Sequence, residues 1–377
     1  MALSKKIENL VVGVDTKNCL VKILRNNGND FKKATIEELS CENELIENQK
    51  IYDILVKILG YYLVSQRPVN PDVYVVLPDY FVTKDVITLP LLPQVKQKEV
   101  LRAELKRLYP NFDNLAISTT VLAKNKKQIV FSVVLVQKGL LLDCVLACKK
   151  HGLNLKGITY SSNCIINSFL ALAKGKYANF LYVNVEETTS KIIYAMQGKT
   201  VCALPLGFGK DFLSIEQQNF LPNFVSSLVA QKELFNSAEN LGAVSYSQSP
   251  EIDQFEKFCQ TQTNKRLKAE EVLQSDKKTV LQNNFQVFSR YILGAAESIA
   301  QKTGLLLPDV AIVNLPANLA SAIKNTDLDI KIALAKDELA EPCLLLDYFD
   351  LYGAIFCEKF NRSQNFLDRQ NSVFKRK

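Results

Sequence analysis

Hydrophobic and polar positions alternate near the start of the chain and then change to helical spacing. The segment NLVVGVDTKNCLVKIL is typical of a strand, a tight turn at residues 15–18 and a second strand. Residues 51–64 carry apolar side chains at helical spacing, and VYVVLP, residues 73–78, is typical of a buried strand. This order predicts an alternating β/α region.

The pattern changes between residues 84 and 156. KDVITLPLLP is extended, and KQKEVLRAELKRLYP has the apolar spacing of an amphipathic helix. Two strands, AISTTVLA and QIVFSVVLV, precede a second helix, LLLDCVLACKKHG. These elements predict a small α/β subdomain inserted into the first domain.

Residues 179–209 repeat the opening arrangement. A shift of 169 positions places Asp15 on Asn184 and Lys22 on Lys191, each at the same place in a strand-turn-strand unit. A repeat at this separation indicates a duplicated domain.

The second half combines a polar region with a long helix. Residues 211–280 are mostly helical in pattern, and we interpret their charge-rich stretch, NKRLKAEEVLQSDKK, as a solvated helix face. A long amphipathic helix is predicted over residues 281–303, followed by the buried strand VAIVNLP. The chain closes with a basic tail, residues 361–377.

Composition bounds the chemistry. The 377 residues are 47% hydrophobic and 23% charged, which is ordinary for a soluble protein of two domains. The single histidine, His151, excludes zinc or iron sites built from two or three His ligands of this chain. Nine scattered cysteines without a Cys-x-x-Cys pair predict reduced thiols in a reducing compartment. Cys144, Cys148 and His151 have helical spacing that could offer metal ligands, but without a recognisable fourth ligand the spacing favours helix packing.

Hydropathy argues against a membrane-spanning segment and a signal peptide, and charge argues against nucleic acid binding. No apolar run approaches the ~20 residues that cross a bilayer, and the first ten residues lack a signal-peptide core. The net charge of +7 is modest and no basic-aromatic motif accompanies it, so nucleic acid is not an expected partner.

Five segments carry a resemblance to one family. They are VVGVDTKNCLVKIL, VITLPLLPQVKQKEVLRAELKRLYP, CVLACKKHGLNLKGITY, ALPLGFG and YGAIFCEKF, in this order along almost the whole chain. With them the chain resembles the PilM and FtsA-like actin-fold proteins of type IV pilus assembly, and also the cytoplasmic part of the type II secretion L component.

The resemblance implies an α/β fold of duplicated actin-like (ribonuclease H-like) domains. The implied parts are a first actin-like domain of residues 1–83 and 157–176, an inserted small α/β subdomain of residues 84–156, a second actin-like domain of residues 177–210 and 281–360, a helical subdomain of residues 211–280, and the tail of residues 361–377.

A nucleotide in this fold needs hairpin turns whose amides hold phosphate, with glycine where the backbone must approach the ligand. The positions that the resemblance assigns to the cleft are Asp15, Lys17, Lys22, Asn184, Glu186, Thr188, Thr189 and Asn314. Several depart from the family pattern.

The departures work against nucleotide. Lys17 and Glu186 stand where the hairpins should have glycine, and Asn184 replaces an aspartate. The third turn reads Asn-Leu-Pro, in which Pro316 removes an amide donor. Ser161 and Ser162 lie where the family often has an acidic residue between the domains, and GFGKD is interpreted as a domain turn rather than a phosphate loop.

The resemblance with its departures predicts a non-catalytic scaffold, a pseudo-ATPase for which no cofactor and no metal is expected. The implied partner is an inner-membrane platform protein, through a PilN-like N-terminal peptide or an L-component equivalent; a pilus or secretion ATPase and self-association are further possibilities, and the expected location is the bacterial cytoplasm beside the inner membrane. The alternatives are an active ATPase that binds Mg-ATP with altered loops, and an FtsA-like membrane tether.

The tail suggests how such a tether would work. Apolar side chains share one helical face beside cations, and the predicted membrane-facing residues are Phe366, Leu367, Val373, Phe374, Lys375 and Arg376. FtsA-like proteins use a basic amphipathic end in this way. A solvated, frayed C-terminus is the other interpretation.

Overall fold

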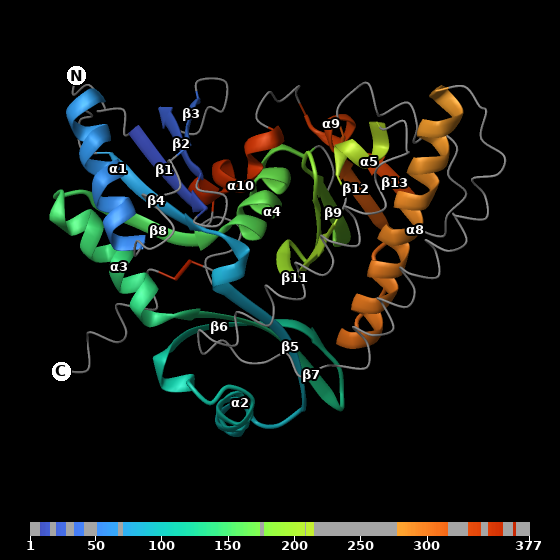
Figure 1. The fold of residues 1–377 in the computed structure, drawn as a ribbon. Helices are drawn as coiled ribbons and strands as arrows, with labels where there is room; N and C mark the ends of the chain where they lie inside the picture. Colours follow the sequence, from blue (N-terminus) through green and yellow to red (C-terminus); the bar gives the residue numbers. More distant parts are fainter. Residues whose placement is uncertain are drawn as a thin grey trace, which may run out of the picture.

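The structure is a computed structural model in which two similar α/β domains stand side by side above a third, smaller unit (Figure 1). The residues that it describes are 8–15, 20–27, 34–40, 51–66, 71–173, 177–207, 209–214, 277–315, 331–340, 346–356 and 365–366. The predicted helical subdomain lies almost entirely outside these residues, as do Lys17, Pro316 and the tail from Leu367 onward.

The first domain is built on a five-stranded sheet with the order β3-β2-β1-β4-β8. Its strands are β1 (Glu8–Asp15), β2 (Leu20–Asn27), β3 (Thr35–Ser40), β4 (Asp72–Leu77) and β8 (Asn154–Tyr160). The first three strands are antiparallel, whereas β4 is parallel to both β1 and β8.

The second domain repeats this arrangement in the order β11-β10-β9-β12-β13. Its strands are β9 (Asn179–Val185), β10 (Ser190–Met196), β11 (Lys199–Leu206), β12 (Val310–Asn314) and β13 (Lys331–Leu334). The antiparallel and parallel pairs fall at the same places as in the first sheet. The chain therefore has the duplicated actin-like fold, and the long helix α8 (Lys277–Thr303) covers the outer face of the second sheet.

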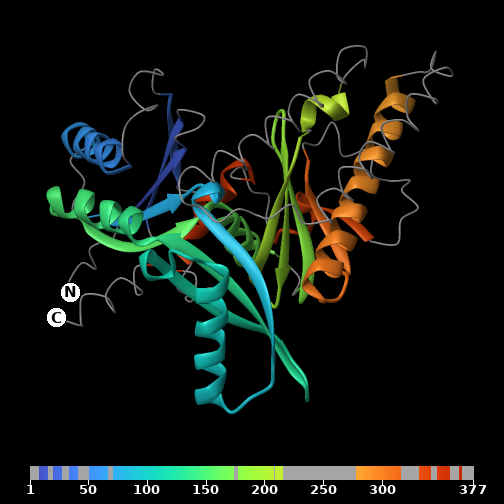
Figure 2. The ribbon, with the colours of Figure 1, turned by 60° about the horizontal axis from the view of Figure 1, so that its bottom comes forward.

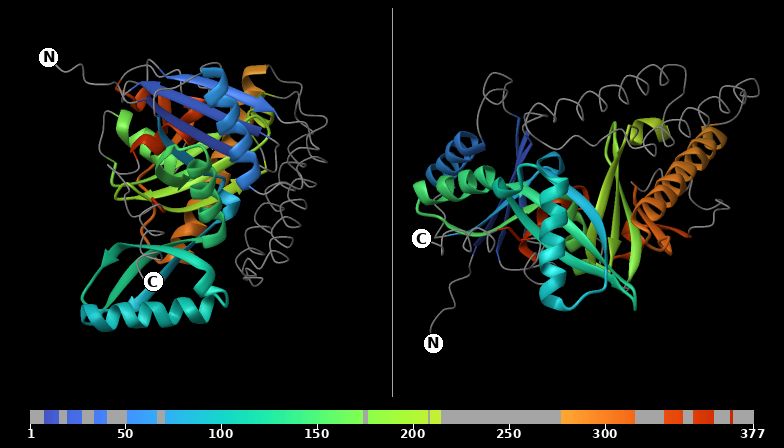
Figure 3. Two further views of the ribbon diagram at one scale, coloured as in Figure 1. Left: turned by 90° about the vertical axis from the view of Figure 1, so that its left-hand side faces the viewer. Right: turned by 90° about the horizontal axis from the view of Figure 1, so that it is seen from below.

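The inserted subdomain has its own small core and projects away from the two domains (Figures 2 and 3). Its strands β5 (Val82–Pro90), β6 (Leu115–Lys124) and β7 (Gln128–Gln137) form a sheet in the order β5-β7-β6. The helix α2 (Gln94–Leu108) buries Leu101 and Leu105 against this sheet, which confirms the helix and strands expected from the pattern.

The boundary of the inserted subdomain differs from the expectation. Helix α3 (Lys138–Lys150) packs on α1 (Ile51–Gln66), where Leu141 and Cys144 join the core of the first domain. Strand β8 pairs with β4 in the first sheet. Residues 138–156 thus belong with the first domain, because the apolar stripe of α3 is covered by α1 rather than by the inserted sheet.

Two helical segments are exchanged between the domains: helix α4 in one direction, and the consecutive helices α10 and η8 in the other. Helix α4 (Ser161–Leu172) follows the first sheet, yet its Phe169 packs on Phe180 and Tyr182 of the second. Helix α10 (Phe349–Tyr352) and the 3-10 helix η8 (Gly353–Phe356) follow the second sheet but bury Leu351 and Tyr352 against the first. Each half of the chain therefore completes the core of the other half.

The exchanged helices touch at their backbones. A Cβ atom at Gly353 would lie 1.8 Å from the carbonyl oxygen of Cys164, closer than any carbon can approach. Ser168 of α4 also donates a hydrogen bond of 2.9 Å to the carbonyl of Phe349. Glycine is required here for close packing and not for its conformation, because the φ of Gly353 is −66°.

The last described residues lie along β8. The amide of Phe366 donates to the carbonyl of Ile158, and the side chain of Asn365 accepts from the amide of Ile158. The Phe366 ring is fully buried in the core of the first domain. The expectation that Phe366 faces a membrane is therefore wrong, since burial in the protein core leaves the ring no surface for lipid. Among the described helices, none is long and apolar enough to cross a membrane.

We expect Gly353→Ala to lower the free energy of unfolding by about 3 kcal/mol, because the added methyl group must push the two exchanged helices apart. Urea unfolding followed by circular dichroism measures the change. Gly139→Ala in α3 is the matched control: no heavy atom lies within 4 Å of the added Cβ, and alanine there should stabilise by about 0.5 kcal/mol. Equal midpoints for the wild type and Gly353→Ala would contradict the packing constraint.

Candidate functional site

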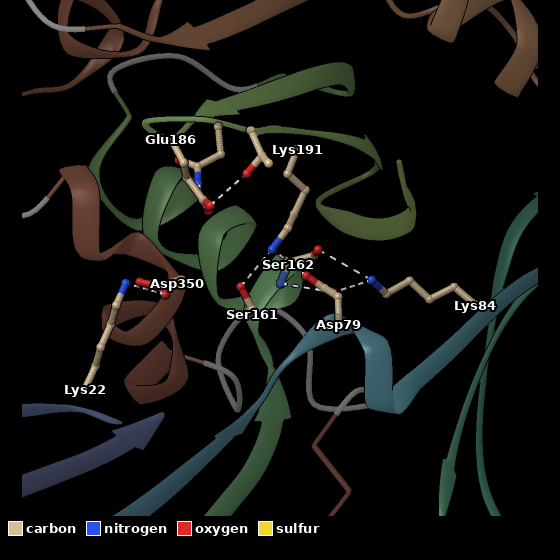
Figure 4. Close-up of polar contacts among 10 residues, drawn as sticks. Lys22, Asp79, Lys84, Ser161, Ser162, Glu186, Lys191 and Asp350 are labelled. Carbon is tan, nitrogen blue, oxygen red and sulfur yellow. Dashed lines mark hydrogen bonds and ion pairs between the residues drawn. The ribbon is translucent and has the colours of Figure 1, made fainter. Parts of the chain in front are cut away.

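A partly buried aspartate joins all three parts of the structure. Asp79 begins the 3-10 helix η3 (Asp79–Phe81), directly after β4 and Pro78. Its Oδ1 lies 2.5 Å from Nζ of Lys84 on β5 of the inserted subdomain. Its Oδ2 lies 2.8 Å from Nζ of Lys191 on β10 of the second domain. We call Asp79, Lys84 and Lys191 the interdomain triad (Figure 4).

Asp79 and Lys191 stabilise each other's charged forms. Burial opposes the charge of Asp79, but Lys191 and Lys84 together hold the pKa of this carboxyl well below its ordinary value. Burial also opposes the charge of Lys191, yet Asp79 and Glu186 raise its pKa above the ordinary value. At Lys84 burial outweighs the attraction of Asp79, so the pKa of that ammonium is lowered. The side chain of Lys84 is only 7% exposed, against 23% for Lys191.

A second ion pair mirrors the first. Lys22 of β2 lies 3.4 Å from Asp350 in the first turn of α10. Burial lowers the pKa of Lys22, but Asp350 and Glu38 raise it above its ordinary value. Because α10 is one of the exchanged helices, this pair holds the C-terminal segment against the first sheet.

The first turn of α4 meets the triad. Lys191 Nζ lies 3.3 Å from Oγ of Ser161, and Lys84 Nζ lies 3.4 Å from Oγ of Ser162. The amide of Ser162 donates to Asp79 at 3.4 Å. A carboxylate at the N-terminus of a helix is favoured by the helix dipole, which adds to the stability of Asp79 in its charged form.

Four of the predicted cleft residues form one hydrogen-bonded chain. Asn314 Nδ2 donates to Asn184 at 3.3 Å, and Asn184 Nδ2 donates to Glu186 at 3.1 Å. The hydroxyl of Thr189 donates to the other carboxylate oxygen of Glu186 at 3.4 Å. The amide of Glu186 donates to the carbonyl of Thr189. Glu186 thus closes the hairpin turn with its own carboxylate.

The GFGKD segment packs on the same turn, as its interpretation as a domain turn requires. The amides of Lys210 and Asp211, which open the short helix α5 (Lys210–Ser214), donate to the carbonyls of Glu186 and Glu187 at 2.8 and 3.0 Å. A Cβ at Gly209 would lie 2.3 Å from the Glu186 carbonyl oxygen, so only glycine fits. These amides donate to hairpin carbonyls and are therefore not available to bind phosphate.

The two hairpins agree in the direction of their lysine side chains but differ in strand register. Lys22 and Lys191 both point to the interdomain side, as the repeat predicts (Figure 4). Lys191 lies directly opposite Asn184 in its hairpin. Lys22 lies opposite Gly13 rather than opposite Asp15. A constant shift of 169 positions therefore matches the faces of the two hairpins but not their strand partners.

The remaining predicted residues lie outside the triad. Asp15 accepts a hydrogen bond of 3.1 Å from the hydroxyl of Tyr80. Thr188 is exposed at the tip of the second hairpin. Lys17 is not among the described residues.

Asp79, Lys84 and Asp350 were not predicted as site residues from the sequence. A signal existed for Asp79, because polar residues that follow a buried strand of a parallel pair lie at the edge where sites form. Lys84 and Asp350 carried no such signal, since nothing local relates their positions to Asp79 or Lys22.

One of the two serines beside the triad is enclosed by the protein. Ser162, near the Lys84 ammonium, is fully buried, so this serine is closed to a substrate. No three His, Cys, Asp or Glu side chains of the described segments gather as metal ligands. Cys148 is buried on α3 and burial raises its pKa to about 12, while His151 contacts the carbonyl of Val56 at 2.9 Å. These residues pack and cap a helix.

We expect Asp79→Asn to lower the free energy of unfolding at pH 7 by about 2 to 3 kcal/mol, since it leaves two cations facing a neutral amide. The folded-state pKa of Asp79 is depressed, so its contribution is complete above the ordinary aspartate pKa of about 4 and is lost as pH falls toward the folded-state value.

Urea unfolding at pH 7 and pH 3 tests both statements. The difference between wild type and Asp79→Asn should be smaller at pH 3, and Asp113→Asn, which changes an exposed aspartate, should match the wild type at both pH values. A difference that does not depend on pH would show that the carboxylate charge is not the cause.

The fold has counterparts among solved structures, although no protein-family model and no curated protein sequence matches the chain. The PilM-PilN type IV pilus biogenesis complex is 12% identical with a TM-score of 0.49, covering 93% of this chain and 98% of that one. The cytoplasmic domain of EpsL, an inner-membrane component of the type II secretion system of Vibrio cholerae, is 13% identical with a TM-score of 0.35, covering 53% and 71%. A ROK family glucokinase from Streptomyces griseus is 10% identical with a TM-score of 0.39, covering 92% and 97%. The assignment of the actin-like fold to this chain rests on the strand order of its two sheets.

Proposed function

We propose that this protein is a non-catalytic actin-like scaffold that works beside the inner membrane of a bacterial pilus or type II secretion platform. The single observation that supports it best is that the hairpin lysines are paired with carboxylates of the protein. Lys22 and Lys191 stand on the two hairpins that would hold phosphates, and both are bound to carboxylates of the protein itself.

The ion pairs substitute for a ligand between the domains. A bound nucleotide would join the two hairpins through its phosphates. Here Asp79 joins the second domain to the first, and Asp350 fastens α10 to β2. These pairs connect the domains through the protein's own charges, which supports a scaffold of fixed shape.

Glu186 adds an electrostatic obstacle. Its carboxylate lies on the turn of the second hairpin, and its partners Asn184 and Thr189 are neutral. The backbone carbonyls of the turn already accept the amides of Lys210 and Asp211. Lys191 attracts the Glu186 carboxylate but is already paired with Asp79, so a phosphate at this turn would face the negative charge of Glu186, which disfavours binding.

A titration with Mg-ATP tests the proposal. We expect no saturable heat in calorimetry and no rise in melting temperature, because the hairpin lysines are already paired with carboxylates. The melting measurement is sensitive enough, since a ligand present at 100 times its Kd would stabilise the folded state by about 2.7 kcal/mol. Micromolar affinity that is lost in Asp15→Ala would instead support an ATP-binding protein. Phosphate release proportional to protein concentration, and lost in the same variant, would support an active ATPase.

The partner we propose is an extended peptide from the cytoplasmic end of a membrane protein. Within the described residues, β6 forms one edge of the inserted sheet and has no strand on its outer side. An edge strand can accept a peptide through main-chain hydrogen bonds. The resemblance to PilM and the L component gives the class of protein from which the peptide would come.

Peptides from the cytoplasmic N-termini of single-pass membrane proteins encoded beside this chain would test this step. We expect one of them to bind with micromolar affinity in fluorescence anisotropy. Its backbone N-methylated form should bind at least about tenfold more weakly, because N-methylation removes the donors that strand addition needs. Equal binding of the two forms would exclude strand addition, and failure of all peptides would count against the scaffold role.

A further inference from the structure

The net charge of the inserted subdomain is nearly as positive as that of the whole chain. Residues 82–137 contain nine Lys and Arg residues against four Asp and Glu residues, a net charge of +5, compared with +7 for all 377 residues. Lys84 belongs to the interdomain triad, whereas the other eight cations are exposed. The concentration of charge is therefore a property of the surface.

Five of these cations gather at the far end of the subdomain. We call this set the distal lysine cluster; its members are Lys96, Lys98, Lys124, Lys126 and Lys127. The first turns of α2 and the turn of the β6–β7 hairpin project to the same side of the molecule (Figure 2), while Leu122 and Val130 beside that turn pack against the second domain. The two turns are tied together by the amide of Leu91, which donates to the carbonyl of Lys127 at 2.8 Å.

The position of the cluster is unfavourable for the helix itself. The N-terminus of a helix carries a partial positive charge that favours acidic side chains. The first turn of α2 has none, its N-cap Pro93 makes no side-chain cap, and lysines follow at positions 96 and 98. This arrangement costs local stability, so helix formation does not explain it.

Apolar side chains accompany the lysines. Val95 is 72% exposed at the start of α2, and Val121 is 41% exposed near the hairpin. Glu99 is the one exposed acidic residue in the same turns of α2. Cations with a few exposed apolar side chains match a surface that offers dense negative charge and a shallow apolar layer.

We propose that the distal lysine cluster rests on the surface of a membrane rich in anionic lipid. The cluster lies on a projecting end formed by two separate elements (Figure 3), which suits a broad flat surface. An acidic peptide is the other chemistry that such charge could attract. The isolated exposed valines and the spread of the lysines over a helix and a hairpin favour the lipid surface.

Flotation of the full chain with vesicles tests the proposal without any partner protein, so its result is independent of the peptide-binding role. We expect the chain to float with vesicles of phosphatidylglycerol and phosphatidylcholine in equal parts, and not with phosphatidylcholine alone. The variant Lys96→Glu/Lys126→Glu/Lys127→Glu should bind at least about 100-fold more weakly, because each cation near the surface is worth a factor of about 5. Raising the salt from 0.1 M, where the screening length is about 10 Å, should also weaken binding.

The control variant Lys149→Glu/Lys150→Glu/Lys331→Glu makes the same change in net charge at exposed positions on α3 and β13. It should float like the wild type, and circular dichroism checks that both variants are folded. The proposal is overturned if the wild type does not float with phosphatidylglycerol, if the cluster variant floats as well as the wild type, or if the control loses binding equally. Tight binding to soluble polyglutamate without flotation would also overturn it, in favour of an acidic polypeptide.

Discussion

The contact of helix α4 with the segment α10–η8 is the constraint on which the rest of the structure depends. Gly353 meets the backbone of Cys164 with no room for a side chain, and Ser168 binds the carbonyl of Phe349. Because α4 covers the second sheet and α10 covers the first, neither domain has a complete core by itself. Folding of the two halves is therefore coupled by burial of apolar surface, and the two hairpins are brought face to face.

That arrangement means that charged side chains at the junction need partners of opposite charge. Lys191 and Lys22 point into a region of restricted solvent, where an unpaired ammonium would be costly. Asp79 and Asp350 supply the compensating charges, and the first turn of α4 supplies the serine hydroxyls and an amide. A junction whose cations are paired with carboxylates of the protein has less to gain from an anionic ligand, and the proposed scaffold role rests on this pairing.

The inserted subdomain is linked to both domains and also carries an exposed charged surface. Lys84 at the start of β5 binds Asp79, and Leu122 and Val130, beside the β6–β7 hairpin, join the core of the second domain. The hairpin turn and the first turns of α2 carry exposed lysines that no fold requirement explains. A contact made by these lysines would therefore be connected to the two domains through a sheet rather than through a loop.

The sequence by itself determined the elements, the duplication and the weakness of the nucleotide motifs. Strands and helices followed from apolar periodicity, and the departures at Asn184, Glu186 and Asn314 were visible as residue types; their mutual hydrogen bonds fit the predicted grouping. Tertiary structure alone decided the partners of Lys22 and Lys191, the placement of α3 with the first domain, and the burial of Phe366. These depend on contacts between residues far apart in the chain: Lys22 and Asp350 are separated by 328 positions, and no local pattern encodes which charge will meet which.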